Sequence, residues 1–386
     1  MKLTEHKAFE LFERYNIPTM KGIILDSKDC IAEKVEKGGL SYPVVIKAQI
    51  QVGGRGKAGG IRFAKNGYEA QEIVDSMLFK ELKGFKIKQV MVVEKASLVK
   101  EWYISIMLDR LTKKPMLIFS AMGGMDIEDT AKSNPEAITK ISIDPFISVN
   151  DYTVRYLLSK SNAHVEIFSK LYPIVINLFR LFTEYDCMLI EINPLGIDDS
   201  GKIIAIDGKV DIDDSALFRL PEILEFREMM RDQEDPLIVA TRDLGFMYIP
   251  IKEDGNIAVM SNGSGMLMSC IDLITSNRLK VKAALDLGGG ATAERIKEAV
   301  RILLKTRGIK ALFIYIFGGI TRCDEVAKGI KEGYEMHEGS LSLIISLEGT
   351  NKEIGKRIIK SIDGDVQLVE GPQEGINELA KRRALL

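Results

Sequence analysis

The last third of the chain contains three apolar segments that are each followed closely by a glycine-rich loop. The segments cover residues 257–260, 281–285 and 311–317, and the loops read Asn-Gly-Ser-Gly at 262–265, Gly-Gly-Gly-Ala-Thr at 288–292 and Gly-Gly-Ile-Thr at 318–321. A buried strand, a glycine turn and then a helical pattern is how an open α/β sheet presents backbone N–H groups to anions. Three such loops in succession predict a ligand with several phosphates, or a phosphorylated group.

The strand-then-helix alternation continues to the end of the chain, with further strand patterns at 342–346 and 366–369. This alternation predicts a parallel sheet with helices on both faces. It begins near residue 238, just after the polar run REMMRDQEDP at 227–236. Because domain boundaries fall in exposed polar stretches, we expect one domain over 1–237 and a second over 238–386.

The composition is that of a globular protein, and it argues against several function classes. The 386 residues are 46% hydrophobic and 28% charged, with a net charge of −2 and no basic block. The length favours two or three domains, and the charge balance argues against a nucleic-acid partner. No apolar run approaches the ~18 residues of a membrane span. The chain starts directly with a charged amphipathic helix pattern, so we expect no signal peptide.

The cysteines and histidines give a further indication of the compartment and the chemistry. The four cysteines are widely spaced and form no Cys-x-x-Cys pair, so we interpret them as reduced thiols of a cytoplasmic protein. The three histidines, His6, His164 and His337, lie away from the glycine turns. Chemistry that needs a histidine nucleophile or base therefore has no evident source in this chain.

The first part of the chain predicts a mixture of helices and strands. Helical patterns cover 4–15, 68–80 and 150–185, and strand patterns cover 43–48, 61–64, 88–94, 102–109 and 115–120. Two more strand patterns, 187–192 and 202–206, flank Asp-Asp-Ser-Gly at 198–201. That tetrapeptide is a strong hairpin signal.

Lys47 lies in a buried strand pattern just before the run GGRGKAGG at 53–60. The spacing of Gly54, Gly56 and Gly59 matches the dinucleotide fingerprint, but a strand pattern follows instead of a helix, and the P-loop sequence is absent. We interpret the run as a flexible glycine hairpin that folds its amides over nucleotide phosphates, with Lys47 and Arg55 adding positive charge. The alternative is a surface turn beside a solvated lysine, although five glycines in eight residues exceed what a turn requires.

Glu191, Asn193 and Asp207 lie on or beside the two strands of the predicted hairpin. With the turn centred near residue 199.5, Asn193 and Asp207 come almost opposite each other, and Glu191 shares a face with Asn193. Three oxygen-bearing side chains on one patch of sheet suit Mg²⁺, which takes oxygen ligands and bridges to phosphate. Spacing alone also permits the alternative of ordinary edge-strand polarity.

Two weaker signals accompany these motifs. Glu94 follows the apolar run 90–93, where its carboxylate could accept from a ribose hydroxyl, and Glu101 follows soon after; a glutamate on a solvated strand end is the commoner case. The helix pattern after the loop at 318–321 begins at the loop, so its N-terminus would favour an anion. A tight turn explains any one such loop, but three loops favour anion binding.

Together these motifs resemble one family, the β subunits of succinyl-CoA synthetase (succinate–CoA ligase). The runs GGRGKAGG at 53–60 and FGGI-x-RCD at 317–324 are specific, and the resemblance covers essentially the whole chain. Its other carriers include EINPL at 191–195, DGK at 207–209, NGSG at 262–265 and DLGGGAT at 286–292. The resemblance implies an α/β protein with an ATP-grasp nucleotide-binding domain of two subdomains, followed by a flavodoxin-like, parallel-sheet CoA-ligase domain.

The resemblance also implies roles for individual residues. The residues that would contact the nucleotide are Lys47, Gly54, Arg55, Gly56, Glu94, Glu101 and, through its backbone, Ser97. The residues that would hold Mg²⁺ are Asn193 and Asp207. Those that would line the site for the carboxylate substrate and phosphate are Asn262, Gly319, Ile320 and Thr321. Glu191 would hydrogen-bond a phosphohistidine of a partner subunit while that group visits the nucleotide site.

In this family the phosphorylated histidine and the CoA site belong to a separate α subunit, so the resemblance implies a hetero-oligomer. The implied reaction converts succinate, CoA and a nucleoside triphosphate reversibly to succinyl-CoA, the nucleoside diphosphate and phosphate. Two alternatives stay open: a malate–CoA or related acid–CoA ligase β subunit, and a nucleotide-binding regulatory or scaffold subunit without turnover. The choice of ATP or GTP, and of an αβ or (αβ)₂ assembly, is open as well.

Overall fold

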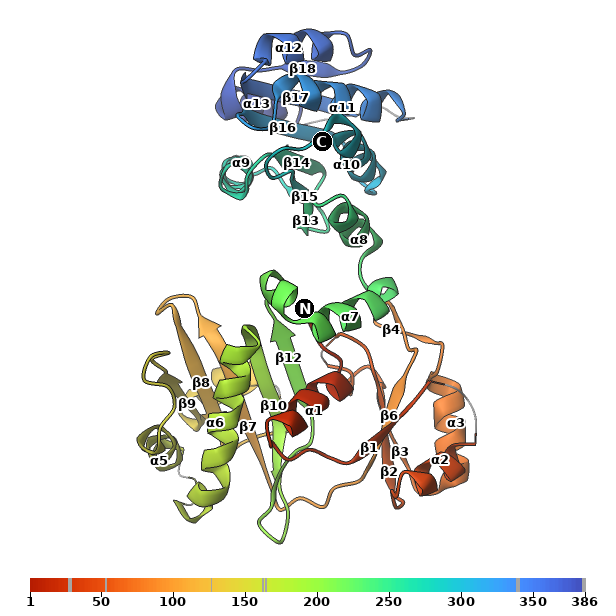
Figure 1. The fold of residues 1–386 in the computed structure, drawn as a ribbon, viewed down its shortest axis with the longest axis vertical. Helices are drawn as coiled ribbons and strands as arrows, with labels where there is room; N and C mark the ends of the chain where they lie inside the picture. Colours follow the sequence, from red (N-terminus) through yellow and green to blue (C-terminus); the bar gives the residue numbers. More distant parts are fainter. Residues whose placement is uncertain are drawn as a thin grey trace. The chain divides into compact units, whose positions relative to one another are not determined.

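The chain divides into two compact units. The computed structural model describes residues 1–26, 30–52, 54–125, 127–161, 163, 165–337 and 341–383, so Gly53 and His164 lie outside the described residues. Unit 1 covers Met1–Gln233 and unit 2 covers Glu234–Leu386 (Figure 1). Among the residues that the structure describes, no helix combines the length and the apolar character required to cross a membrane.

A four-stranded antiparallel sheet forms one part of unit 1. It pairs β1 (Gly22–Leu25), β6 (Val90–Glu94), β2 (Val44–Ala48) and β3 (Ile61–Ala64) in that order. The helices α2 (Ile31–Lys37) and α3 (Gly67–Met77) close its core, and the short hairpin of β4 (Glu81–Leu82) and β5 (Phe85–Lys86) follows α3. Every residue of β2 is buried, which explains why its sequence is a nearly continuous apolar run.

A larger antiparallel sheet forms the rest of unit 1. Its order is β11 (Ile203–Ala205), β10 (Cys187–Ile197), β7 (Lys100–Asp109), β8 (Lys114–Ser120) and β9 (Ile138–Ser142), and β12 (Gly208–Ile212) also pairs with β10. The helices α1 (Glu5–Arg14), α5 (Asp151–Lys160) and α6 (Phe168–Glu184) bury apolar stripes in its core, and α4 (Ile127–Ser133) and α7 (Pro221–Met229) complete the unit. The start of the chain is tied to β12, because Leu3 N donates to Val210 O at 2.9 Å.

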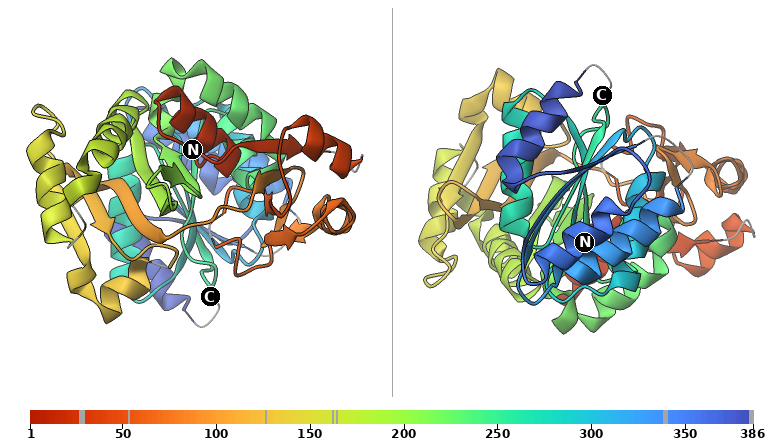
Figure 2. Two further views of the ribbon diagram at one scale, coloured as in Figure 1. Left: turned by 90° about the horizontal axis from the view of Figure 1, so that it is seen from below. Right: turned by 90° about the horizontal axis from the view of Figure 1, so that it is seen from above.

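Unit 2 is a sheet with helices on both faces. After α8 (Pro236–Asp243), its parallel strands lie in the order β15 (Val281–Asp286), β14 (Ile257–Ser261), β16 (Ala311–Gly318), β17 (Ser342–Gly349) and β18 (Val366–Leu368). The helices α10 (Ala293–Lys305), α11 (Cys323–Glu335) and α12 (Lys352–Lys360) cover one face, and α9 (Ser264–Ser276) and α13 (Gly371–Lys381) cover the other (Figure 2). Numbered along the chain, the parallel strands run 2-1-3-4-5, the flavodoxin-like order, with the topological switch point between β14 and β16.

Most of the predicted elements are confirmed, including the five parallel strands and the hairpin around 198–201. The helical pattern at 150–185 is instead two helices, because Ser161 ends α5 and donates its hydroxyl to Leu157 O. The sequence patterns do not predict β1, β9, β12 or β13 (Met247–Pro250), which are only four or five residues long. β13 also adds an antiparallel edge strand to the sheet predicted to be parallel.

Gly349 sets the close approach of the ends of β16 and β17, and its replacement by alanine is expected to destabilise unit 2. A Cβ atom here would stand 2.0 Å from Gly318 O, and the backbone φ is +96°. Overpacking and unfavourable φ together are expected to lower the free energy of unfolding, measured by urea denaturation, by roughly 3 kcal/mol. Gly289→Ala is the matched control, since a Cβ there meets nothing within 4 Å. Equal losses of stability in the two variants would contradict this account.

Candidate active site

One cavity in unit 1 brings together nearly all the residues predicted to bind nucleotide and metal. Its volume is about 720 Å³, and residues of β2, β6, β10, β12 and the β2–β3 loop line it; small-molecule sites commonly have this size. The predicted residues among its lining are Lys47, Gly54, Arg55, Gly56, Glu94, Glu101, Glu191, Asn193 and Asp207. Ser97 differs, because it is exposed and does not line the cavity, whereas its neighbours Ala96 and Leu98 do.

The glycine-rich run forms a loop between two antiparallel neighbours, β2 and β3, as the sequence predicts. The loop closes on itself, because Gly60 N donates to Arg55 O at 2.8 Å. Gly54 and Gly59 have φ values of +68° and +80°, which glycine adopts at little cost. The Arg55 side chain turns back to β2, where its Nη1 donates to Ala48 O at 3.1 Å. The loop therefore fixes a guanidinium group beside Lys47.

Two cations and two carboxylates form a connected network in this cavity. Glu5 Oε1 accepts from Lys47 Nζ at 2.6 Å, and Glu5 Oε2 accepts from Arg55 Nη2 at 2.8 Å. Arg55 Nη2 also donates to Asp207 Oδ1 at 2.9 Å, and Lys47 Nζ donates to Ile206 O at 2.7 Å. The side chains of Glu5, Lys47 and Arg55 are 0%, 6% and 8% exposed. Charges buried this deeply require partners of opposite sign. In this network the two carboxylates and the two cations are those partners for one another.

Glu5 is a member of this site that the sequence analysis does not identify. It lies in the first turn of α1, where an acidic residue is favourable in any helix. Its position beside Lys47, 42 residues further along the chain, comes from tertiary packing. The available signal is indirect: a lysine within an otherwise apolar, buried strand requires a carboxylate partner from elsewhere.

Asn193 and Asp207 face each other across the hairpin, close to the predicted register. The pairing of β10 with β11 centres the hairpin at residue 200, and Asn193 N donates to Asp207 O at 3.3 Å. The Asn193 side chain is oriented at both ends, because its Oδ1 accepts from Gly124 N and its Nδ2 donates to Met125 O, each at 2.8 Å. The local hairpin thus brings an amide and a carboxylate to one place.

The chemistry of this pair fits Mg²⁺ bound together with phosphate. Mg²⁺ usually takes one or two protein oxygens and completes its shell with substrate phosphates and water. Within the described ranges, no group of three or more histidine, cysteine, aspartate or glutamate side chains is arranged to enclose a metal. Burial, followed by the charge of Glu5, raises the pKa of Asp207 to about 6, while Arg55 and Lys47 oppose the shift. A cation at this position would favour the ionised carboxylate.

Glu191 lies on β10 and lines the same cavity. The Tyr103 hydroxyl of β7 donates to Glu191 Oε2 at 3.5 Å, and Lys209 of β12 is the cross-strand neighbour of Glu191. Burial raises the pKa of Glu191, and the Lys209 ammonium opposes this shift. A carboxyl group in such surroundings is a candidate for hydrogen bonding to an incoming imidazole or for proton transfer.

Glu94 and Glu101 line the cavity from β6 and β7. Glu94 Oε1 accepts from Ser41 N at 2.5 Å, so this oxygen is held at the end of β6. The Glu101 carboxylate lies so close to Gly124 that a Cβ atom there would stand 2.2 Å from Oε2. Because Gly124 N also orients Asn193, Glu101 and Asn193 meet at one short glycine segment.

In unit 2, the three glycine loops meet at the carboxyl edge of the parallel sheet. The Asn262 side chain joins the first loop to the third, since it donates to Phe317 O at 2.9 Å and accepts from Phe317 N at 3.0 Å. Thr321 joins the third loop to the second, because Gly290 N donates to its hydroxyl oxygen at 2.9 Å. Ligands of open α/β sheets bind in the crevice at such a switch point.

The helices α9, α10 and α11 begin at these loops. Their N-termini carry no capping hydrogen bond from a side chain in the described structure, and backbone N–H groups at a helix N-terminus can donate to an anion. A Cβ atom at Gly319 would meet nothing within 4 Å, and Ile320 is 87% exposed, whereas Thr321 is only 2% exposed. Gly319 and Ile320 therefore face solvent at this edge, and Thr321 connects the loops from behind.

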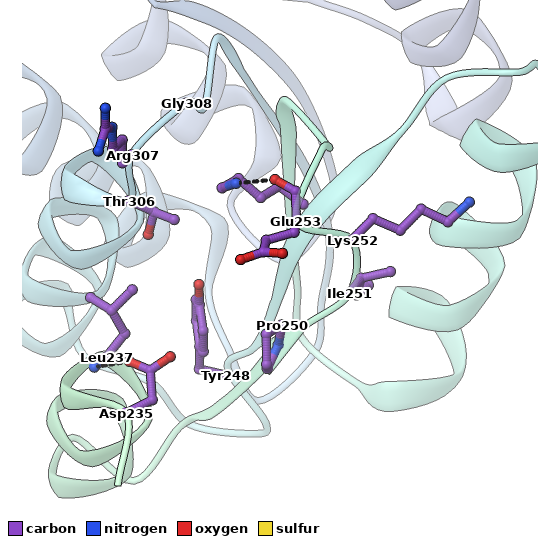
Figure 3. A pocket seen from close by; sticks show the side chains of 11 residues that line it. Asp235, Leu237, Tyr248, Pro250, Ile251, Lys252, Glu253, Thr306, Arg307 and Gly308 are labelled. Atoms are coloured by element: carbon purple, nitrogen blue, oxygen red, sulfur yellow. Dashed lines mark hydrogen bonds between the residues drawn. The ribbon is translucent and has the colours of Figure 1, made fainter. Parts of the chain in front are cut away.

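A second cavity, of about 550 Å³, lies at the opposite, amino edge of the sheet in unit 2. Its lining comes from the start of α8, from β13 and the segment after it, from the start of β15 and from the turn after α10. Figure 3 shows Asp235, Tyr248 and Glu253 directed toward a common space, while Lys252 extends away from it. Lys282 Nζ closes one side by donating to Glu253 O at 2.6 Å. The residues predicted to bind ligands do not line this cavity, so the candidate site of unit 2 is the glycine-rich edge.

Comparisons with known proteins agree with this two-part description. A model of the ATP-grasp domain matches residues 2–197, and a model of the CoA-ligase family matches residues 260–371. The β subunit of ADP-forming succinate–CoA ligase from Aquifex aeolicus is 41% identical over 366 residues, which cover 93% of each chain. The corresponding subunit of Methanocaldococcus jannaschii is 39% identical, and the match covers 93% of this chain and 94% of that subunit. The subunit of Bacillus pumilus is 36% identical, and the match covers 98% of this chain and 99% of that subunit.

Among solved structures, ATP citrate lyase from Methanothrix soehngenii in complex with citrate and coenzyme A matches 99% of each chain with a TM-score of 0.70. The sequence identity is 16%, so this likeness concerns the fold alone. The predicted fold class, an ATP-grasp region followed by a CoA-ligase domain with a parallel sheet, is confirmed by the two family models and by the strand order.

Proposed function

Because the chain belongs to the family of β subunits of ADP-forming succinate–CoA ligase, we propose that it binds the nucleotide and the carboxylic acid of such a ligase. The proposed reaction converts succinate, CoA and ATP reversibly to succinyl-CoA, ADP and phosphate. The names of the relatives support succinate over the malate alternative, and ATP over GTP.

The observation that carries the proposal is the cavity of unit 1, which unites two cations with two oxygen ligands of a kind that suits Mg²⁺. For phosphoryl transfer, the protein mainly positions the reacting groups and neutralises the charge of the phosphates. Lys47, Arg55 and the amides of the glycine loop would hold the phosphates, and Glu94 would accept from a ribose hydroxyl. Asn193 and Asp207 would hold Mg²⁺, which when bound neutralises charge on the phosphates.

The phosphoryl acceptor is proposed to be a histidine of a partner α subunit, which also supplies the CoA site. No described residue lining the cavity is a histidine, which supports an acceptor from outside this chain. His6, in α1, pairs with Glu10 and does not line the cavity. Glu191 would hydrogen-bond the partner's imidazole while it receives or returns the phosphoryl group.

The glycine-rich edge of unit 2 would bind the carboxylate substrate and phosphate. Asn262, Gly319 and Ile320 lie where three helices begin, and helix N-termini favour anions. We further propose a cytoplasmic location, which is supported by the four free cysteine thiols, since reduced thiols are typical of that compartment.

Thr321→Val is expected to impair the step that uses succinyl-CoA and phosphate without impairing the step that uses the nucleotide. The variant keeps the shape of the side chain but removes the acceptor of the Gly290 N–H group. Losing one such partner typically costs about 1–3 kcal/mol, so phosphorylation of the partner by phosphate and succinyl-CoA should slow by roughly tenfold. Thr306→Val, at the amino edge of the same sheet, is the matched control. Equal slowing of both steps would argue against this role for Thr321.

The proposed function is tested by purifying the chain with its partner from the native cell and incubating the complex with γ-labelled ATP or GTP and Mg²⁺. We expect the label on a second polypeptide as acid-labile phosphohistidine, with ATP the better donor and with discharge by succinate plus CoA. Absence of a labelled partner would overturn the proposal. Discharge by malate but not by succinate would reassign the substrate.

A further inference from the structure

We propose that Glu5 is a positioning residue that sets Lys47 and Arg55 in the geometry needed to receive the nucleotide phosphates. The proposal rests on the function proposed above. It adds a residue from α1 to a site otherwise built from β-strands and their loops.

The first line of argument is the geometry of the Glu5 carboxylate. Each of its oxygens binds a different cation, Lys47 Nζ at 2.6 Å and Arg55 Nη2 at 2.8 Å. The two cations come from different elements, since Lys47 lies on β2 and Arg55 lies on the glycine loop. One fully buried carboxylate therefore fixes the loop cation relative to the strand cation.

The second line of argument is that Glu5 is itself fixed. The next residue, His6, donates its backbone N–H to Gln49 Oε1 at 2.9 Å, and Gln49 Nε2 donates to Lys47 O at 3.2 Å. On the other side, Leu3 N donates to Val210 O at 2.9 Å. The start of α1 is thus bound to β2 and β12 at once. Lys47 lies on β2, and Asp207 directly precedes β12.

The third line of argument is electrostatic. Without the Glu5 carboxylate, Lys47 and Arg55 would be two buried like charges, with Asp207 as the carboxylate still paired to Arg55. Like charges at short range repel strongly where water is excluded. The two side chains would then move apart, and this displacement would disturb their placement for a phosphate. Glu5 acts through them and does not itself need to touch the nucleotide.

The test uses the complete enzyme with its partner subunit and the variant Glu5→Gln, which keeps the shape and removes the charge. Glu10→Gln, on the same helix at a more exposed position, is the matched control. Partner phosphorylation is measured in two ways: from labelled ATP, and from labelled phosphate with succinyl-CoA. The second route does not use the nucleotide cavity.

We expect Glu5→Gln to raise the KM for ATP by about 10- to 100-fold, the range typical of residues that support a binding site from behind, while labelling from phosphate and succinyl-CoA is unchanged. Glu5→Asp, which keeps the charge but draws it back by one methylene, should show a smaller rise and serves if Glu5→Gln does not assemble. Parallel loss of both labelling routes, or an unchanged KM, would overturn the positioning role. A wild-type complex that labels no partner would overturn the proposed function instead.

Discussion

Replacing Asp207 by asparagine is expected to reduce Mg²⁺-dependent phosphorylation of the partner by ATP on the order of 100-fold, because a bound metal contributes several kcal/mol to stabilising the transferring group. The variant keeps the shape of the side chain but removes its charge. It also leaves Arg55 with Glu5 as its remaining carboxylate partner in this network, so the guanidinium group loses one of its two ion pairs.

The decisive measurement is a Mg²⁺ titration of labelling at fixed ATP. A weaker apparent affinity for Mg²⁺ in Asp207→Asn would support its role as a metal ligand. Asp199→Asn, in the turn of the same hairpin and exposed, is the matched control and should behave as the wild type. An Asp207 variant whose Mg²⁺ dependence is unchanged would contradict the metal assignment, even if its overall rate were lower, because loss of the Arg55 contact alone lowers the rate without shifting the titration.

The parts of this fold and site that the sequence predicts are those set by local structure. The turn at 198–201 determines the register of the hairpin, so the opposition of Asn193 and Asp207 follows from a few residues. The three glycine loops are equally local, because each follows its own strand, and the parallel order of the sheet then brings them to one edge. A pattern of strand, glycine and helix is sufficient to predict that edge as an anion site.

The parts that the sequence does not predict depend on contacts between distant segments. Glu5 reads as an ordinary acidic residue in a first helical turn, and only the packing of α1 against β2 brings it to Lys47. Tyr103, which contacts Glu191, likewise reads as one aromatic residue in an apolar strand. Ser97, which the family match predicts to contact the nucleotide through its backbone, is exposed between two residues that line the cavity, and its contact with the nucleotide stays a prediction. Side-chain periodicity reports burial, and it does not report which buried groups meet.

Glu191→Gln is expected to slow phosphoryl transfer between ATP and the partner's histidine by about 100-fold or more, the usual contribution of a group that assists proton transfer or orients a nucleophile. Glutamine preserves the volume and still accepts a hydrogen bond from Tyr103, so the cavity should keep its shape. What it lacks is the negative charge that would hold an imidazole N–H. Single-turnover labelling at saturating ATP separates this effect from nucleotide binding.

The comparison variant is Glu128→Gln, which neutralises an exposed carboxylate in the lining of the same cavity. If Glu191 acts through a specific hydrogen bond to the imidazole, Glu128→Gln should have a much smaller effect, and the KM for ATP should be similar in both variants. If instead the cavity needs only its total negative charge, the two variants should slow labelling equally. If the Glu191 variant raises the KM for ATP and keeps the single-turnover rate, the role of Glu191 lies in nucleotide binding and not in phosphoryl transfer.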